Sequence, residues 1–211
     1  MGLETIASSK ARWLRRHCNE DDDDADFVYF VSPGDRRRDG MKLGVYGVGK
    51  GGRVFDGWDG PYSVYNEWRR ELSLLALGVE PEEVWNHPSR FRGKPFVELI
   101  DFPDSGNCCI GPKTSAELYH DFVAFAAQAK KHFVARSPTI TPLVRGVGNR
   151  RNLKTHWRRQ VGLVFATRLA RETGGTVPAG SPEDRRWMLE AYRRFRGAFR
   201  TAKDNGLMFF W

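Results

Sequence analysis

The sequence is poor in cysteine and has no long apolar run. Its three cysteines, of which Cys108 and Cys109 are adjacent, lack metal-ligand spacing, so we expect neither a disulfide framework nor a zinc site. No apolar stretch approaches the roughly 18 residues of a membrane span, and no signal-peptide core opens the chain. We therefore expect an intracellular protein, cytoplasmic or nuclear, that is neither secreted nor bound to a membrane.

Aromatic side chains, by contrast, are abundant in this chain of 211 residues. Seven Trp, six Tyr and fourteen Phe can each bury roughly 150 to 250 Å² of surface. A hydrophobic content of 40% together with 28% charged residues is typical of one or two globular domains. The composition therefore excludes disorder throughout and predicts a sizeable core.

Positive charge is concentrated in the last third of the chain. From Arg145 to Trp211 there are fifteen Lys or Arg against five Asp or Glu, whereas the preceding 144 residues carry 19 bases and 21 acids. Thirteen of those fifteen bases are arginines, whose planar guanidinium groups make bidentate contacts with phosphate. A basic excess of this size predicts a polyanionic partner.

Proline, glycine and charge patterns divide the chain into four parts. Residues 1–26, which contain an unbroken acidic run, are expected to form a flexible tail. Residues 27–136 carry strand and helix patterns and form the body. Residues 137–150, rich in Pro, Gly, Ser and Thr, are expected to be a linker, and residues 151–211 a basic two-helix segment.

Within the body, apolar periodicity predicts both strands and helices. The glycines at 49, 51 and 52 stand between two short strand-like runs and indicate a hairpin turn. The fold class is therefore α+β, a small antiparallel sheet in the order hairpin-helix-strand-helix, followed by two basic α-helices. Strands are predicted at 27–31, 42–48, 53–58 and 96–102, and helices at 63–77 and 114–133.

The two basic helices are predicted over about 152–172 and 181–203. In the second helix, arginines recur every seven residues on the side opposite the apolar Tyr192, Phe195 and Phe199. Such helices could contact phosphates or dock on an acidic protein surface. The candidate contacts are Lys154, Arg158, Arg186, Arg193, Arg196 and Arg200.

Motifs for catalysis or a cofactor are weak. The stretch that ends at Gly51 almost fits a phosphate-binding loop, but Gly51 replaces the Ser or Thr that ligates magnesium, and a strand follows instead of a helix. Asp56, Asp101 and Asp104 could meet and hold magnesium for nuclease chemistry, although turns also need Asp beside Gly and Pro. We expect no cofactor and no metal.

The segment from Lys42 to Phe133 carries a short pattern of aromatic and basic residues. This order resembles the amino-terminal hybrid-binding domain of type 1 eukaryotic ribonucleases H, also called the caulimovirus viroplasmin-like domain. A basic-aromatic patch at 90–96 and the helix start at Ser115 are similar to later parts of the same pattern. The residues that carry the resemblance are Tyr46, Val48, Lys50, Gly51, Arg53, Phe55 and Trp58.

The resemblance implies a three-stranded antiparallel sheet with two helices that binds the shallow minor groove of RNA–DNA hybrid or double-stranded RNA. Trp58 could equally be a core residue. Under the resemblance, the surface readers would be Tyr46, Lys50, Arg53 and Trp58, with Arg92 and Lys94 reaching phosphate.

These features together predict non-catalytic binding of structured RNA or RNA–DNA hybrid, with the body reading groove shape and the arginines supplying affinity. A structural or assembly protein that docks its arginine-rich helices on an acidic protein partner is the alternative. A metal-dependent nuclease is the second alternative, and the oligomeric state is left open.

Overall fold

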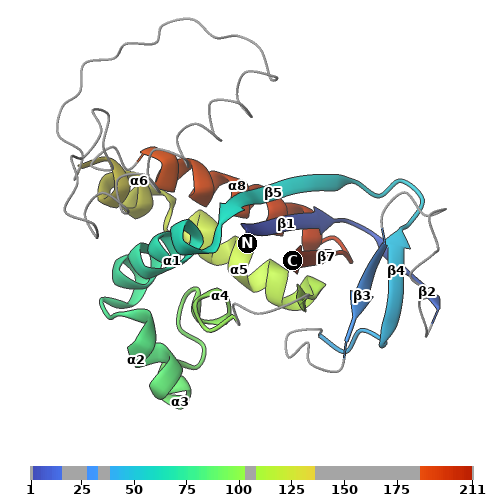
Figure 1. Cartoon of the computed structure of the whole chain (residues 1–211), viewed down its shortest axis with the longest axis horizontal. Coiled ribbons are helices and arrows are strands. Elements are labelled where there is room, and N and C mark those ends of the chain that lie inside the picture. Colours follow the sequence, from blue (N-terminus) through green and yellow to red (C-terminus); the bar gives the residue numbers. More distant parts are fainter. Residues whose placement is uncertain (1, 16–27, 33–38, 103–107, 136–185, 211) are drawn as a thin grey trace, which may run out of the picture.

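One long antiparallel ladder runs through the protein and bends in its middle. The computed structural model describes residues 2–15, 28–32, 39–102, 108–135 and 186–210 (Figure 1). The strands are β1 (Gly2–Ser8), β2 (Ala11–Arg15), β3 (Val28–Val31), β4 (Gly44–Val48), β5 (Val54–Pro61), β6 (Cys108–Ile110) and β7 (Leu207–Phe210). The helices are α1 (Tyr62–Leu77), α2 (Pro81–Asn86), α3 (Pro88–Phe91), α4 (Val97–Ile100), α5 (Pro112–Ala124), α6 (Ala126–Ala135) and α8 (Arg186–Ala202).

The strands form two antiparallel sheets, and the chain has the predicted α+β class. One sheet has the order β5-β1-β7-β6 and the other the order β2-β4-β3. The β1–β5 and β2–β4 pairs are two halves of the same ladder, because Ser8 lies opposite Val54 and Ala11 lies opposite Val48. The ladder bends between these pairs. There Ser9 and Lys10, which connect β1 to β2, face residues 49–53, which connect β4 to β5.

The hairpin predicted for 42–48 and 53–58 is wrong. β4 and β5 belong to different sheets, and the glycines between them form a bulge loop, residues 49–53, rather than a hairpin turn. In this loop the Gly49 amide donates to the Lys10 carbonyl at 2.8 Å, and the Ser9 amide donates to the Arg53 carbonyl at 2.9 Å. The partner strands come from the far N-terminal residues, which no local turn pattern could indicate.

The expected tail is also wrong for residues 2–15, which form β1 and β2. Leu3, Ile6 and Ala7 are buried, and β1 lies between β5 and β7, so both of its edges are paired. Thr5, Ile6, Ala7 and Ser8 are buried in succession, so the strand shows no clean alternation of buried and exposed side chains. The acidic run, within 16–27, lies outside the described residues.

Helix α8 fills the main core with its apolar side. It packs across β5 and β1 and against α5 and α6 (Figure 1). Phe195 stacks on Trp68 with ring centroids 4.5 Å apart, and the Trp68 indole N–H donates to the Met188 carbonyl at 3.1 Å. The described part of the basic segment therefore shares one core with the body.

The apolar run before the C-terminus forms the central strand β7. Met208 and Phe210 point into the main core, whereas Leu207 and Phe209 pack in a second core beneath the small sheet. There the Phe209 ring stacks on Tyr29 with centroids 6.0 Å apart. The four-stranded sheet thus lies between the helices and the three-stranded sheet, which explains why consecutive residues of β7 are all apolar.

The strand predicted at 96–102 is a helical turn, α4. Phe96 takes a left-handed conformation with φ 59°, and the Leu99 and Ile100 amides both donate to its carbonyl at 2.9 Å. Phe96, Leu99 and Ile100 are all fully buried. A short run that is apolar on every side fits a buried helical turn as well as a buried strand, so its periodicity does not distinguish the two.

Several predicted elements are confirmed. β3 and α1 match their predicted ranges, and α1 ends at Gly78 in a left-handed cap with φ 71°. The helix predicted over 114–133 is present but is divided at Phe125 into α5 and α6. The expected linker and the first basic helix, 152–172, lie outside the described residues. Among the helices that are described, none combines the length and apolar composition needed to cross a membrane.

Candidate nucleic-acid interface

The bend of the long ladder brings basic side chains from distant parts of the sequence together. Lys10 lies at the turn between β1 and β2, and the bulge loop opposite it carries Lys50 and Arg53. The Lys10 and Ala11 amides donate to the carbonyls of Asp204 and Asn205, at 2.7 and 2.8 Å. The end of α8 is thereby tied to the bend, which places Arg200 beside the bulge loop.

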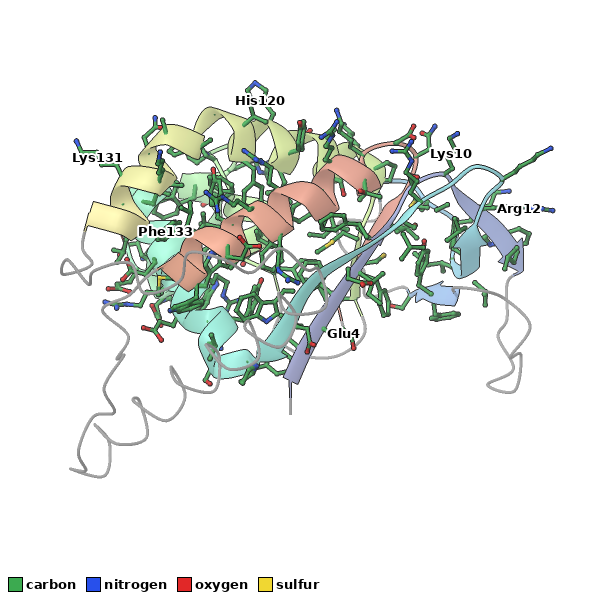
Figure 2. The ribbon with its side chains drawn as sticks, turned by 90° about the horizontal axis from the view of Figure 1, so that it is seen from above. Glu4, Lys10, Arg12, His120, Lys131 and Phe133 are labelled. Carbon is green, nitrogen blue, oxygen red and sulfur yellow. The ribbon has the colours of Figure 1, made fainter. Side chains whose placement is uncertain are left out.

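These segments enclose a groove of about 550 Å³, the bulge groove. Its walls come from the ends of β1 and β5, the bulge loop and the last turn of α8. Its charged lining residues are Lys10, Arg53, Arg200 and Asp204. Figure 2 shows Lys10 and Arg12 pointing outward at the same end of the molecule, so positive charge continues from the groove along β2.

The cations of the bulge groove have no acidic partner within the described part of the chain. None of the hydrogen bonds or ion pairs among the described residues involves the side chains of Lys10, Arg53 or Arg200. Arg200 and Asp204 stand one helical turn apart, a spacing that permits an ion pair, yet they do not form one. Within the described residues, the positive charge of the groove is therefore not neutralised by an ion pair.

The exposed side of α8 extends this surface. Arg193 and Arg200 are exposed and Arg196 is half-buried, while Tyr192 and Phe195 on the opposite side are buried. This confirms the predicted division of the helix into two sides. Arg193 is partly neutralised by an ion pair with Glu190 at 3.7 Å. The Arg186 side chain, Lys154 and Arg158 lie outside the described residues.

Tyr46 and Trp58 do not read a surface, so this part of the prediction is wrong. Tyr46 is 4% exposed in the second core, and its hydroxyl donates to the Lys42 carbonyl at 3.1 Å. Trp58 is fully buried against Trp187 and Phe195, with ring centroids 6.2 and 6.3 Å away. Lys50 and Arg53, between them in sequence, are exposed because the bulge loop leaves the ladder there.

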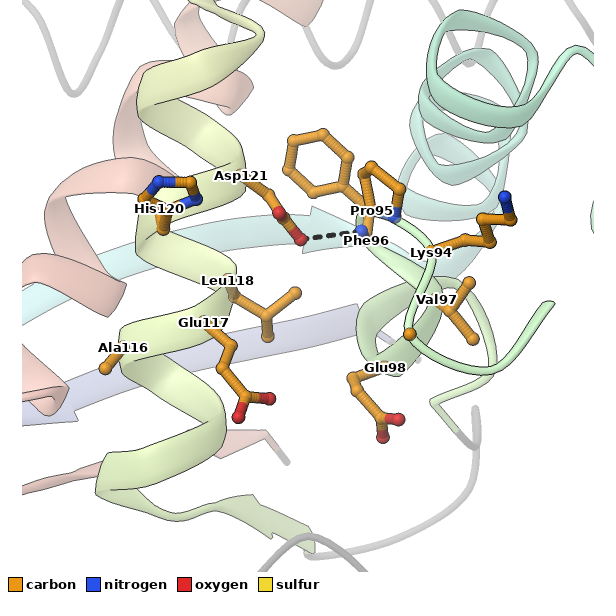
Figure 3. Close-up of a pocket in the computed structure, with 11 residues that line it drawn as sticks. Lys94, Pro95, Phe96, Val97, Glu98, Ala116, Glu117, Leu118, His120 and Asp121 are labelled. Atoms are coloured by element: carbon orange, nitrogen blue, oxygen red, sulfur yellow. Dashed lines mark hydrogen bonds between the residues drawn. The ribbon is translucent and has the colours of Figure 1, made fainter.

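Arg92 and Lys94 are exposed, but Lys94 lines a different groove between α4 and α5. This α4–α5 groove, of about 590 Å³, is shown in Figure 3. Glu98 and Glu117 project from its two walls, whereas the Lys94 side chain points away from both, so the charged side chains that face the groove are mainly carboxylates. The groove is thus less suited to phosphate than the bulge groove.

Asp121 anchors the wall of the α4–α5 groove. Its carboxylate accepts a hydrogen bond of 2.8 Å from the Phe96 amide, which fixes the left-handed residue at the start of α4 (Figure 3). Partial burial raises the pKa of Asp121 above its ordinary value, although the hydrogen bond from Phe96 opposes the shift. Burial also raises the pKa of Tyr192, whose hydroxyl donates to the Phe122 carbonyl at 2.8 Å.

The carboxylates considered for nuclease chemistry are on separate elements. Asp56 is exposed on β5, Asp101 follows α4, and Asp104 lies outside the described residues. No group of three or more His, Cys, Asp or Glu in the described ranges could hold a common metal ion. The described residues therefore offer no metal centre to support the nuclease alternative.

Lys10 and Arg12 belong to the candidate interface but were missed in the sequence. They lie in the segment assigned to a tail, where a lysine after two serines carries no periodic signal. Only the pairing of β1 with β5 and β2 with β4 places them beside the bulge loop. Comparisons of the chain with family models, with curated proteins and with solved structures find no match.

Proposed function

We propose that the protein binds structured RNA or RNA–DNA hybrid without catalysis, through phosphate contacts made by the bulge groove and the exposed side of α8. One observation carries this proposal. Lys10, Arg53 and Arg200, which are far apart in the sequence, line one groove, and no ion pair among the described residues engages them. Unneutralised guanidinium and ammonium groups that converge in this way are suited to phosphate oxygens.

The length of the basic surface favours a polymer over a small anion. Arg193 and Arg200 are two turns apart on α8, which corresponds to roughly 10 Å at about 1.5 Å per residue. The surface then continues through the bulge groove to Arg12. A surface of this extent faces several phosphates of a duplex at once, and each neutralised phosphate releases counterions.

The burial of Tyr46 and Trp58 limits the mode of recognition. Without these rings at the surface, recognition rests on phosphates and on the shape of the helix. A preference for A-form duplexes follows from the resemblance to the hybrid-binding domain, and it stays a prediction. The relationship to that family also stays a prediction.

The test is fluorescence anisotropy with labelled RNA hairpin, RNA–DNA hybrid and DNA duplex, over a salt series and without magnesium. The double variant Arg53→Gln/Arg200→Gln should lose about tenfold or more in affinity and lower the log-log salt slope by about 1.8, because two phosphate contacts are removed. Lys130→Gln/Lys131→Gln removes the same charge from exposed positions of α6 and is the matched control. It should bind within about twofold of the wild type.

Other outcomes would support the alternatives. If no nucleic acid binds at moderate salt, the proposal fails and an acidic protein partner becomes the better explanation of the basic surface. If added magnesium produces cleavage that Asp101→Asn abolishes, the protein is a nuclease. Equal loss of affinity in the test and control variants would show that net charge, and not the groove, determines binding.

A further inference from the structure

The bulge loop has an open backbone beside a lysine. Lys10 and Gly51 both take left-handed conformations, with φ 52° and 71°. The Lys10 Nζ lies 3.6 Å from the position that a Cβ on Gly51 would occupy, so the ammonium rests against the loop. Lys50 and Gly51 are exposed, and their amides take no part in the described backbone hydrogen bonds of the loop. Successive amides of this kind, next to a cation, suit an anion.

The charge of the bulge groove suits a dianion. Lys10, Arg53 and Arg200 contribute three positive charges and Asp204 one negative charge, which leaves a net charge of +2. A terminal phosphate monoester carries about −1.5 to −2 near neutral pH and presents three acceptor oxygens. An internal phosphodiester carries only one negative charge and two such oxygens, so it would leave part of the groove unneutralised.

The floor of the groove is apolar. The Phe55 ring lies over Gly197 of α8, where an added Cβ would come within 2.5 Å of its Cζ, and Val54 beside it is 46% exposed. A side chain at position 197 would therefore collide with the Phe55 ring, and both residues line the groove. The groove volume of about 550 Å³ is within the range of small-ligand sites. A sugar and base attached to the phosphate would find an apolar surface there.

We propose that the bulge groove receives the terminal phosphate monoester of a nucleic-acid strand. The substrate class is then end-phosphorylated RNA or hybrid, with the duplex lying along the exposed side of α8. This inference rests on the proposed function, because it assigns one end of the bound nucleic acid to one part of the same surface. Arg53 and Arg200 would share the phosphate oxygens, and Lys10 would hold the phosphate against the loop.

The test compares the same labelled RNA hairpin with a 5′-phosphate, a 3′-phosphate or hydroxyl ends. One phosphorylated form should bind about fivefold or more tightly than the hydroxyl form, and the arms identify which end is recognised. Lys10→Gln and Arg53→Gln should abolish this preference. Arg193 lies outside the groove on the same helix as Arg200. Arg193→Gln should weaken the binding of all three hairpins equally and leave the preference for the phosphorylated form unchanged. Thermal melting of each variant checks that it is folded.

Each result decides between the two proposals. If all three hairpins bind equally, the terminal-phosphate site is overturned while nucleic-acid binding stands. If none of them binds even at low salt, nucleic-acid binding itself is overturned. A phosphate preference that survives both Lys10→Gln and Arg53→Gln places the site elsewhere and also overturns the inference. Gly197→Ala supplies a second probe, because it displaces Phe55 without changing charge and should reduce the preference.

Discussion

Helix α8 has seventeen residues, and its two sides have different surroundings. On the inner side, Tyr192, Phe195 and Phe199 are buried in the main core. On the outer side, Arg193 and Arg200 are exposed and lead to the bulge groove. Substitutions on the inner side should therefore change stability, whereas substitutions on the outer side should change binding. The following predictions test whether this separation holds.

The largest effect is expected for Phe195→Ala. The ring is fully buried and stacks on Trp68, and it lies among Trp58, Tyr65 and Phe199. Removing a buried phenyl ring leaves a cavity, so the free energy of unfolding should fall by about 3 to 5 kcal/mol. Urea denaturation followed by tryptophan fluorescence measures the change. The free energy of unfolding of Arg193→Ala, on the outer side, should stay within about 0.5 kcal/mol of the wild-type value. A similar loss in both variants would contradict the separation.

Trp58→Phe tests the residue that the sequence suggested as a surface reader. Because Trp58 is fully buried, the smaller ring should cost about 2 kcal/mol of stability through lost packing. The folded variant should bind RNA hairpin with a Kd within about twofold of the wild type. A large loss of affinity at unchanged stability would show that Trp58 does contact nucleic acid.

A gradient of affinity should run along the outer side of α8. Arg200→Gln should weaken hairpin binding by about fivefold and lower the salt slope by about 0.9, because Arg200 lines the groove and has no described acidic partner. Arg193→Gln should weaken binding by less than about twofold, since Glu190 already pairs with Arg193. Anisotropy titrations measure both, and the reverse order would move the interface toward the start of the helix.

Tyr192→Phe should have a moderate effect on stability alone. It removes the buried hydrogen bond to the Phe122 carbonyl, which contributes about 1 kcal/mol net. Urea denaturation should show that loss. Tyr119→Phe is the control, because the described contacts of Tyr119 involve its ring beneath the Lys203 ammonium and not its hydroxyl. If Tyr119→Phe loses as much stability as Tyr192→Phe, the loss of the hydrogen bond is not the cause.

The smallest effect concerns the pH dependence set by Asp121. Because partial burial raises its folded-state pKa, folding favours the protonated carboxyl, and this contribution is complete below the unfolded value of 3.8. It is lost as the pH rises through the folded-state pKa. The Tm of the wild type relative to Asp121→Asn should therefore fall as the pH rises from about 3 to about 7. A rise instead of a fall would contradict the sign.

The elements that were predicted correctly are those whose information is local. α1 and α8 have an apolar face at helical spacing, and Gly78 provides the left-handed cap that ends α1. The two sides of α8 could be assigned for the same reason. The interpretation of 96–102 as a strand failed because its residues are buried on every side, which removes the periodic signal.

The candidate interface could be predicted only in part. Arg200 was identified from the arginine repeat of its helix and Arg53 from the resemblance to the hybrid-binding domain, but Lys10 was not identified, because its role depends on the pairing of β1 with β5. Tyr46 and Trp58 were placed at the surface by the resemblance, and the local pattern could not correct this, because an aromatic residue in a short strand has the same pattern whether it faces solvent or core. Burial is decided by the second layer, here β7 and α8, which comes about 150 residues later in the chain.

The α+β class, the position of the main helices and the basic character of α8 follow from the amino-acid sequence alone. These properties depend on side-chain spacing and composition within about twenty residues, where local geometry dominates. The bulge loop within one long ladder, and the meeting of Lys10, Arg53 and Arg200 in one groove, depend on the three-dimensional fold. Such contacts depend on which distant strands pair, and long-range pairing is selected by burial of the whole core rather than by any local pattern.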